Sequence, residues 1–141
     1  MKYVMDSSVA VKWVIREVDS DKADLLRTDF QNGIHELVSP DIFPVEVAHA
    51  LTRAERQSRI TMGQARDLLA DVLTTAPRFF PYRPLLARAV EISSAMRIGV
   101  YDCLYVALAE AEGCEFVTAD DKLVRNLRNK FPFIIPLASL P

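Results

Sequence analysis

Apolar residues recur along the whole chain in two alternating patterns, one typical of strands and one typical of helices. Short apolar runs predict strands at residues 2–6, 35–39, around 79–80, at 115–118 and at 133–135. Between them, apolar spacings of three and four predict helices after Ser7, at 19–30, after residues 39–41, and at 65–76, 86–93, 102–111 and 120–129. Strands separated by helices indicate a mainly parallel sheet covered on both faces. We therefore expect an α/β fold, a three-layer α/β/α sandwich with about four to five strands, in one domain spanning 1–141.

Several helix ends carry recognisable signals. Ser7 and Ser8 can cap the first helix, and the Asn32-Gly33 pair closes the second. Residues 61–64, Thr-Met-Gly-Gln, have the form of a capping box, and Gly99 marks the end of the helix that begins near Leu86. The 102–111 helix is apolar almost all round, which predicts burial between layers.

Composition fits a folded protein with a substantial core, since 50% of the 141 residues are apolar and 26% are charged. No apolar run approaches the roughly 20 residues that a membrane helix needs, and the N-terminus has no signal-peptide pattern. We expect a cytoplasmic protein without a membrane partner. Cys103 and Cys114 lack disulfide or zinc spacing and are interpreted as reduced packing thiols.

The net charge of −2 argues against a protein that holds nucleic acid by bulk electrostatics alone. A metal-dependent nuclease is compatible with this charge, because its carboxylate cluster shifts the balance towards acid until cations bind.

Two aspartates follow predicted strands: Asp6 comes after 2–5, and Asp120 comes after 116–118. In an open parallel sheet the functional crevice lies beyond the carboxyl ends of the strands. Asp102 begins the buried helix, and Glu46 lies on the helix entered from the second strand, so all four acids could converge. Singly, each aspartate is better explained as a helix cap and Glu46 as a partner of Arg53. Together, four acids that repel one another indicate a cation site.

Four segments resemble, in order and across essentially the whole chain, the motifs of PIN domains of the VapC toxin type. They are residues 4–13, VMDSSVAVKW; 44–51, PVEVAHAL; 101–109, YDCLYVALA; and 117–123, VTADDKL. The resemblance implies that Asp6, Glu46, Asp102 and Asp120 are metal-binding catalytic acids. Ser8 and Thr118 would support them. Asp120, rather than the adjacent Asp121, matches the fourth motif.

This resemblance implies a Mg²⁺-dependent or Mn²⁺-dependent endoribonuclease, the toxin of a type II toxin-antitoxin pair. A metal-activated water would attack the phosphodiester in line, leaving a 5′-phosphate and a 3′-hydroxyl. The substrate would be an RNA, such as a tRNA. The implied partners are a second copy of the chain and a VapB-like antitoxin whose C-terminal segment lies in the active-site groove. One position departs from the family, which often has asparagine where this chain has His49. That histidine either supports the site, binds metal, or pairs with a neighbour.

Basic residues near the motifs are candidates for binding the RNA backbone; they are Lys12, Arg16, Arg53, Arg56 and Arg59. For each alone, a solvated charged face is the better interpretation. Apolar surface around Val9, Trp13 and the 65–76 helix could bind a protein partner, although core packing explains it equally well.

Two other classes of α/β protein also have an aspartate or paired acids near the first strand, but their motifs differ from this sequence. A haloacid-dehalogenase-like phosphatase needs two aspartates spaced by one residue, and position 8 is Ser8. A response-regulator receiver needs paired acids near the N-terminus, which this chain lacks. The remaining alternative is a catalytically inactive PIN-like module that binds RNA or protein, and the presence of all four acids argues against it.

Overall fold

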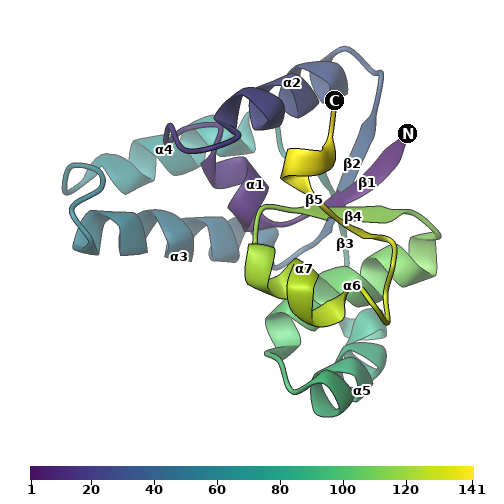
Figure 1. The fold of residues 1–141 in the computed structure, drawn as a ribbon. Coiled ribbons are helices and arrows are strands. Elements are labelled where there is room, and N and C mark those ends of the chain that lie inside the picture. The colour runs from purple at the N-terminus through teal and green to yellow at the C-terminus, as the bar shows by residue number, and fades with distance from the viewer.

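The central sheet has five strands, all parallel, in the order β3-β2-β1-β4-β5 (Figure 1). The computed structural model describes all 141 residues. The strands are β1 (Lys2–Met5), β2 (Glu36–Pro40), β3 (Arg78–Phe80), β4 (Glu115–Thr118) and β5 (Ile134–Pro136). The order runs outwards from β1 to β3 and then returns to the other side of β1, so the strand order reverses between β1 and β4. The predicted parallel α/β sandwich is confirmed.

Alternation along β1 assigns its side chains to the two faces of the sheet. Tyr3 and Met5 belong to one hydrophobic core, whereas Val4 belongs to the other. In register, Tyr3 lies opposite Leu37 of β2 and Glu115 of β4. The central strand is therefore buried on both faces, as its continuous apolar run predicts.

Helices pack on both sides of the sheet, those from the first half of the chain in one hydrophobic core and those from the second half in the other (Figure 1). The first layer consists of α1 (Ser7–Val11), α2 (Ser20–Gln31), α3 (Phe43–Arg56) and α4 (Gln64–Leu73). The second consists of α5 (Leu86–Met96), α6 (Val100–Glu112) and α7 (Asp121–Leu127). Short 3-10 turns at Arg83–Leu85 and Leu137–Ser139 complete the chain. Helices α3 and α4 form a hairpin that extends away from the sheet.

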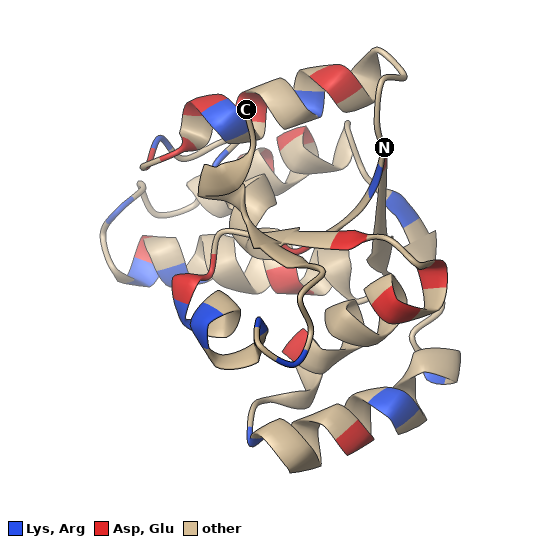
Figure 2. Cartoon of the chain, turned by 45° about the vertical axis from the view of Figure 1, so that its right-hand side comes forward, with Lys and Arg blue, Asp and Glu red and all other residues tan.

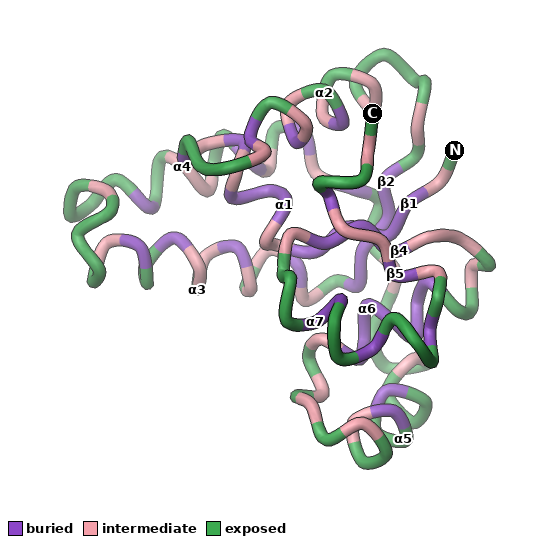
Figure 3. Tube along the Cα trace, in the orientation of Figure 1, coloured by how far each residue is buried: buried purple, intermediate pink, exposed green.

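Helix α6 is the most deeply buried helix of the second layer, as its apolar sequence predicts. Residues 103–109 are all buried, and the ring of Tyr105 stacks on Phe116 of β4 with centroids 5.8 Å apart. Figure 3 shows the contrast with the tip of the α3–α4 hairpin, where exposed positions dominate. Helix α6 is thus a fixed element from which side chains can reach the edge of the sheet.

Three predicted helix ends differ from the structure. The first helix is capped by Asp6 rather than by Ser7 or Ser8, because the Asp6 carboxylate accepts from the Ser8 amide. Helix α5 ends at Met96 with Arg97 in the left-handed region, so Gly99 instead precedes α6. The 61–64 box is half formed. The Gln64 side chain accepts from the Thr61 amide, but α4 begins at Gln64 itself.

No single helix is long and apolar enough to cross a membrane. Only α5 with its preceding turn and α6, taken together, reach that length and composition, and they are bent by 118° at their break.

Candidate active site

The point where the strand order reverses lies between β1 and β4, and Asp6 and Thr118 stand at the carboxyl ends of these two strands. Loops on either side of such a point diverge and leave a crevice beyond the sheet. Asp6 directly follows β1, and Asp120 lies two residues after the end of β4, so carboxylates lie at this edge of the sheet.

Asp6 is buried, and three donors hold its carboxylate. The Ser8 amide donates to Oδ1 at 3.1 Å, the Ser8 hydroxyl donates to the same oxygen, and the Thr118 hydroxyl donates to Oδ2 at 2.6 Å. Ser8 Oγ also accepts from the Ala119 amide at 2.9 Å. This network ties the turn after β1 to the turn after β4 and fixes the orientation of Asp6.

The other three acids lie on the first turns or caps of helices. Glu46 is in the first turn of α3 and Asp102 in the first turn of α6. Asp120 caps α7 by accepting from the Leu123 amide at 3.1 Å, and its own amide donates to Thr118 Oγ1. Asp121 is exposed in the first turn of the same helix. Helix N-termini favour nearby negative charge, which offsets part of the cost of gathering acids.

The structure brings the four acids close enough that their charges affect the pKa values of Asp6, Glu46 and Asp102. Burial raises the pKa of Asp6 to about 7; the hydrogen bonds from Ser8 and Thr118 oppose this rise, and the charges of Asp102 and Glu46 add to it. Burial, with the charge of Asp102, also raises the pKa of Glu46. Burial, with the charge of Asp120, raises the pKa of Asp102. Because these partly buried carboxylates repel one another, a cation bound between them would lower their electrostatic energy.

The donor set fits Mg²⁺ or Mn²⁺, although it does not form a complete coordination shell. All four side chains offer carboxylate oxygens, which hard divalent cations prefer, and such cations keep several waters as ligands. No three His, Cys, Asp or Glu side chains surround one point at ligand distance. The acids therefore form an acidic cluster, and a cation bound there would take its remaining ligands from water.

A groove of about 430 Å³ adjoins this acidic cluster, and basic side chains line its wall. Ser8, Glu46 and Ala119 line the end beside the acids, and Lys12, Arg53 and Arg59 line the remainder. Elsewhere acidic and basic segments are interspersed over the ribbon (Figure 2). The groove thus offers cations for a polyanion next to the carboxylates, despite the negative net charge.

Not every predicted residue joins this groove. Arg16 faces a different hollow and pairs with Asp24 at 2.7 Å, and Arg56 is exposed outside the groove. His49 lines the groove, but its imidazole makes no hydrogen bond to any of the acids. Lys12 and Arg53 line the groove, whereas Arg16 and Arg56 do not. The sequence did not distinguish them, because helical spacing alone does not show which side of a helix borders the crevice.

The suggested apolar docking surface is corrected by the structure. Val9 is 0% exposed and Trp13 only 6% exposed, with the Trp13 indole donating to the Ala23 carbonyl at 2.9 Å. On the 65–76 stretch, Ala65 and Val72 are buried as well. These residues are core, because α2 and α4 cover the short first helix.

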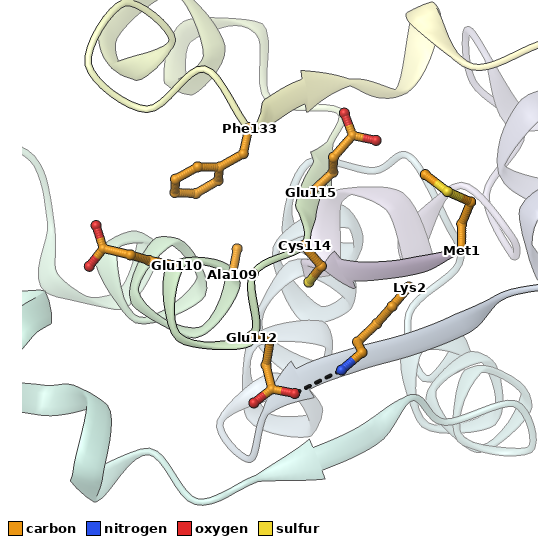
Figure 4. Close-up of a pocket in the computed structure, with 9 residues that line it drawn as sticks. Met1, Lys2, Ala109, Glu110, Glu112, Cys114, Glu115 and Phe133 are labelled. Atoms are coloured by element: carbon orange, nitrogen blue, oxygen red, sulfur yellow. Dashed lines mark hydrogen bonds and ion pairs between the residues drawn. The ribbon is translucent and has the colours of Figure 1, made fainter.

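A second hollow, of about 620 Å³, lies at the opposite edge, where β1 and β4 begin (Figure 4). Its Glu112 is paired with Lys2 at 2.9 Å, and burial raises the pKa of its Cys114 thiol. A protonated thiol is a weak nucleophile and a weak metal ligand. Glu110 of this hollow is paired with Arg88 at 2.7 Å, so two of the three acids that line the hollow have basic partners.

Two residues of the site were not predicted from the sequence. Tyr105 sends its hydroxyl towards Glu46, and Glu17 pairs with both Lys12 and Arg59 in the groove. The spacing of three between Asp102 and Tyr105 on one helix was a signal for the first. No local signal existed for Glu17, which lies in a loop between two helices.

Fold and site together define an α/β protein with a cluster of carboxylates at the point where the strand order of a parallel sheet reverses. The PIN domain family model matches residues 3–128. The chain therefore belongs to the PIN-domain family. It is 29% identical over 137 residues to ribonuclease VapC3 of Pyrobaculum aerophilum, covering 96% of this chain and 98% of that one. It is 30% identical over 123 residues to ribonuclease VapC12 of Mycobacterium tuberculosis, covering 87% and 90%.

Solved structures agree on the fold. PAE2754 from Pyrobaculum aerophilum superposes with a TM-score of 0.70 at 19% identity, over 99% of this chain and 94% of that one. VapBC2 from Rickettsia felis, bound to a DNA fragment from its promoter, superposes with a TM-score of 0.62 at 16% identity, over 96% and 97%.

Proposed function

We propose that this protein is an endoribonuclease that acts as the toxin of a type II toxin-antitoxin pair and requires Mg²⁺ or Mn²⁺. The observation that carries the proposal is the convergence of four acids at one edge of the sheet: the charges of Asp102 and Glu46 act on Asp6, that of Asp102 acts on Glu46, and that of Asp120 acts on Asp102. Relatives named ribonuclease VapC, similar over most of their length, support the same activity.

In this proposal the four acids hold the cation, and hydrogen bonds orient two of them. Asp6 is oriented by Ser8 and Thr118, and Asp120 is held in place by capping α7. A divalent cation supplies Lewis acidity towards the scissile phosphate and a hydrolytic water. Lys12, Arg53 and Arg59 position the phosphate backbone in the groove. Neither cysteine takes part, because burial raises the pKa of both thiols.

The proposed partners follow from the site and the exposed surface. The substrate is an RNA, with tRNA as the first candidate, and a VapB-like antitoxin blocks the groove; a structural relative is a VapBC complex. A second copy of the chain is proposed to bind through α5, where Leu86 and Val90 are exposed one turn apart.

The test uses purified, antitoxin-free protein with total tRNA and with a generic single-stranded RNA. Cleavage is measured with Mg²⁺, with Mn²⁺ and with EDTA, alongside Asp6→Asn. We expect cleavage that depends on the metal and is lost in the variant. Cleavage that survives both EDTA and the substitution would contradict the mechanism. RNA binding without cleavage of either substrate under any condition would favour the inactive binding module.

A further inference from the structure

Tyr105 carries a buried hydroxyl that forms no hydrogen bond. The residue is 0% exposed, and no group of the chain pairs with its hydroxyl oxygen. Buried side-chain polar atoms are nearly always paired, because an unpaired one loses its hydration without compensation. Since phenylalanine would fill the same space without this loss, the hydroxyl requires an explanation.

The position of the Tyr105 hydroxyl explains why a tyrosine is found here. Asp102 and Tyr105 are three residues apart on α6 and so share one face of the helix. The hydroxyl faces the Glu46 carboxylate on α3, near enough to influence its ionisation, and the charges of Asp6 and Asp102 act on the hydroxyl in turn. The Tyr105 hydroxyl is therefore an uncharged hydrogen-bond donor that points from the second helical layer into the acidic cluster.

The ring and the carboxylate differ in how firmly they are held. The Tyr105 ring stacks on Phe116 at an interplanar angle of 16°, two residues before Thr118 on β4. Glu46, in contrast, is half-buried, and no hydrogen bond fixes its carboxylate, whereas Asp6 is held by Ser8 and Thr118. A rigid unused donor thus lies beside an acid that lacks one.

We propose that Tyr105 is a positioning residue of the cleavage site, whose hydroxyl donates to Glu46 and holds that carboxylate in the orientation that binds the divalent cation with Asp6 and Asp102. The inference rests on the proposed function, since it assigns a role towards the metal. Groups that hydrogen-bond to metal-binding carboxylates orient them and tune their affinity.

The test is Mn²⁺ binding by titration calorimetry without RNA, comparing wild type with Tyr105→Phe, which keeps the stacked ring and removes only the hydroxyl. We expect the dissociation constant for Mn²⁺ to rise by about 10- to 100-fold. The unfolding temperature should be unchanged or higher, because the unpaired hydroxyl is gone. Cleavage should fall at low Mn²⁺ and recover towards the wild-type rate when Mn²⁺ saturates the variant.

Tyr101→Phe is the matched control, because it removes the same group from an exposed residue of the same helix. It should leave Mn²⁺ affinity unchanged. A double-mutant cycle with Glu46→Gln tests whether Tyr105 acts through Glu46. If it does, Tyr105→Phe should have no further effect once the carboxylate is neutral.

The outcomes separate this inference from the proposed function. Wild-type Mn²⁺ affinity in Tyr105→Phe, with binding lost in Asp102→Asn, would overturn the role of Tyr105 and leave the nuclease site standing. An additive loss in the cycle, or failure of Tyr105→Phe to fold cooperatively, would also overturn it. Wild-type affinity in Asp102→Asn would remove the metal site itself, and the role of Tyr105 with it.

Discussion

The Thr118 hydroxyl donates a 2.6 Å hydrogen bond to Oδ2 of Asp6, joining two residues that are 112 positions apart in the chain. The same hydroxyl oxygen accepts from the Asp120 amide at 3.1 Å. One side chain at the end of β4 therefore sets the orientation of an acid on the neighbouring strand and the start of the helix that carries another.

Replacing Thr118 with valine should weaken the site while preserving side-chain volume. The change leaves a buried Asp6 oxygen and the Asp120 amide without partners, which costs about 1–3 kcal/mol of the free energy of unfolding. Mn²⁺ affinity should fall by about 10- to 100-fold, measured by calorimetry alongside urea unfolding. Thr118→Ser keeps the hydroxyl and should retain most of the affinity. Wild-type affinity in Thr118→Val, or a loss in Thr118→Ser as large as that in Thr118→Val, would contradict a role that belongs to the hydroxyl alone.

Asp6→Asn should change how stability depends on pH in EDTA. The pKa of Asp6 in the folded protein is raised to about 7, so the folded state keeps a proton that the unfolded state releases. Its stabilising contribution is complete below about pH 4 and is lost as pH rises to about 7, a loss of about 4 kcal/mol. The variant has no such proton, so its unfolding free energy should fall less steeply over this window.

Urea unfolding at several pH values measures that slope. Asp21→Asn, which neutralises an exposed carboxyl on α2, should retain the wild-type slope. A slope in Asp6→Asn as steep as that of the wild type would refute the assignment of the proton to Asp6.

Arg53→Gln and Arg56→Gln should differ in RNA binding, although both remove a charge from the last turn of α3. Arg53 lines the groove, whereas Arg56 does not. Measured in an Asp102→Asn background that prevents cleavage, loss of Arg53 should weaken binding and reduce the salt dependence by about one phosphate contact. Arg56→Gln should bind like its parent. Indistinguishable behaviour of the two variants would place the RNA elsewhere.

Glu17→Gln should strengthen RNA binding. Glu17 pairs with Lys12 at 3.5 Å and with Arg59, so it competes with phosphate for two cations of the groove. Its removal should raise the affinity for RNA in filter binding at low salt, with an effect that fades as salt screens the groove. Asp24→Asn is the control, because it releases Arg16 outside the groove. Weaker binding by Glu17→Gln would mean that Glu17 orders these cations rather than competing for them.

The sequence was sufficient to predict the layers and the places of the acids, because both depend on local pattern. An aspartate that follows an apolar run, as Asp6 and Asp120 do, can be located without knowing what packs against it. Val9 and Trp13 looked equally suitable for surface or core, because their burial is due to α2 and α4, which a local pattern does not position. The pairing of Glu17 with Arg59 spans 42 residues and depends on two loops meeting. The alternation of strand and helix does not determine such a contact.

The central place of β1 has a consequence for how the protein is made. β1 is synthesised before the other four strands, yet one of its two neighbours in the sheet, β4, begins at Glu115. Pairing over such sequence separations is slow, and it cannot start before the later strand exists. Asp6 therefore gains its hydrogen bond from Thr118, and the four acids come together, only after β4 and Asp120 have been synthesised. While residues up to 120 are being synthesised, the chain lacks the assembled acid cluster, so any activity that needs all four acids begins only after that point.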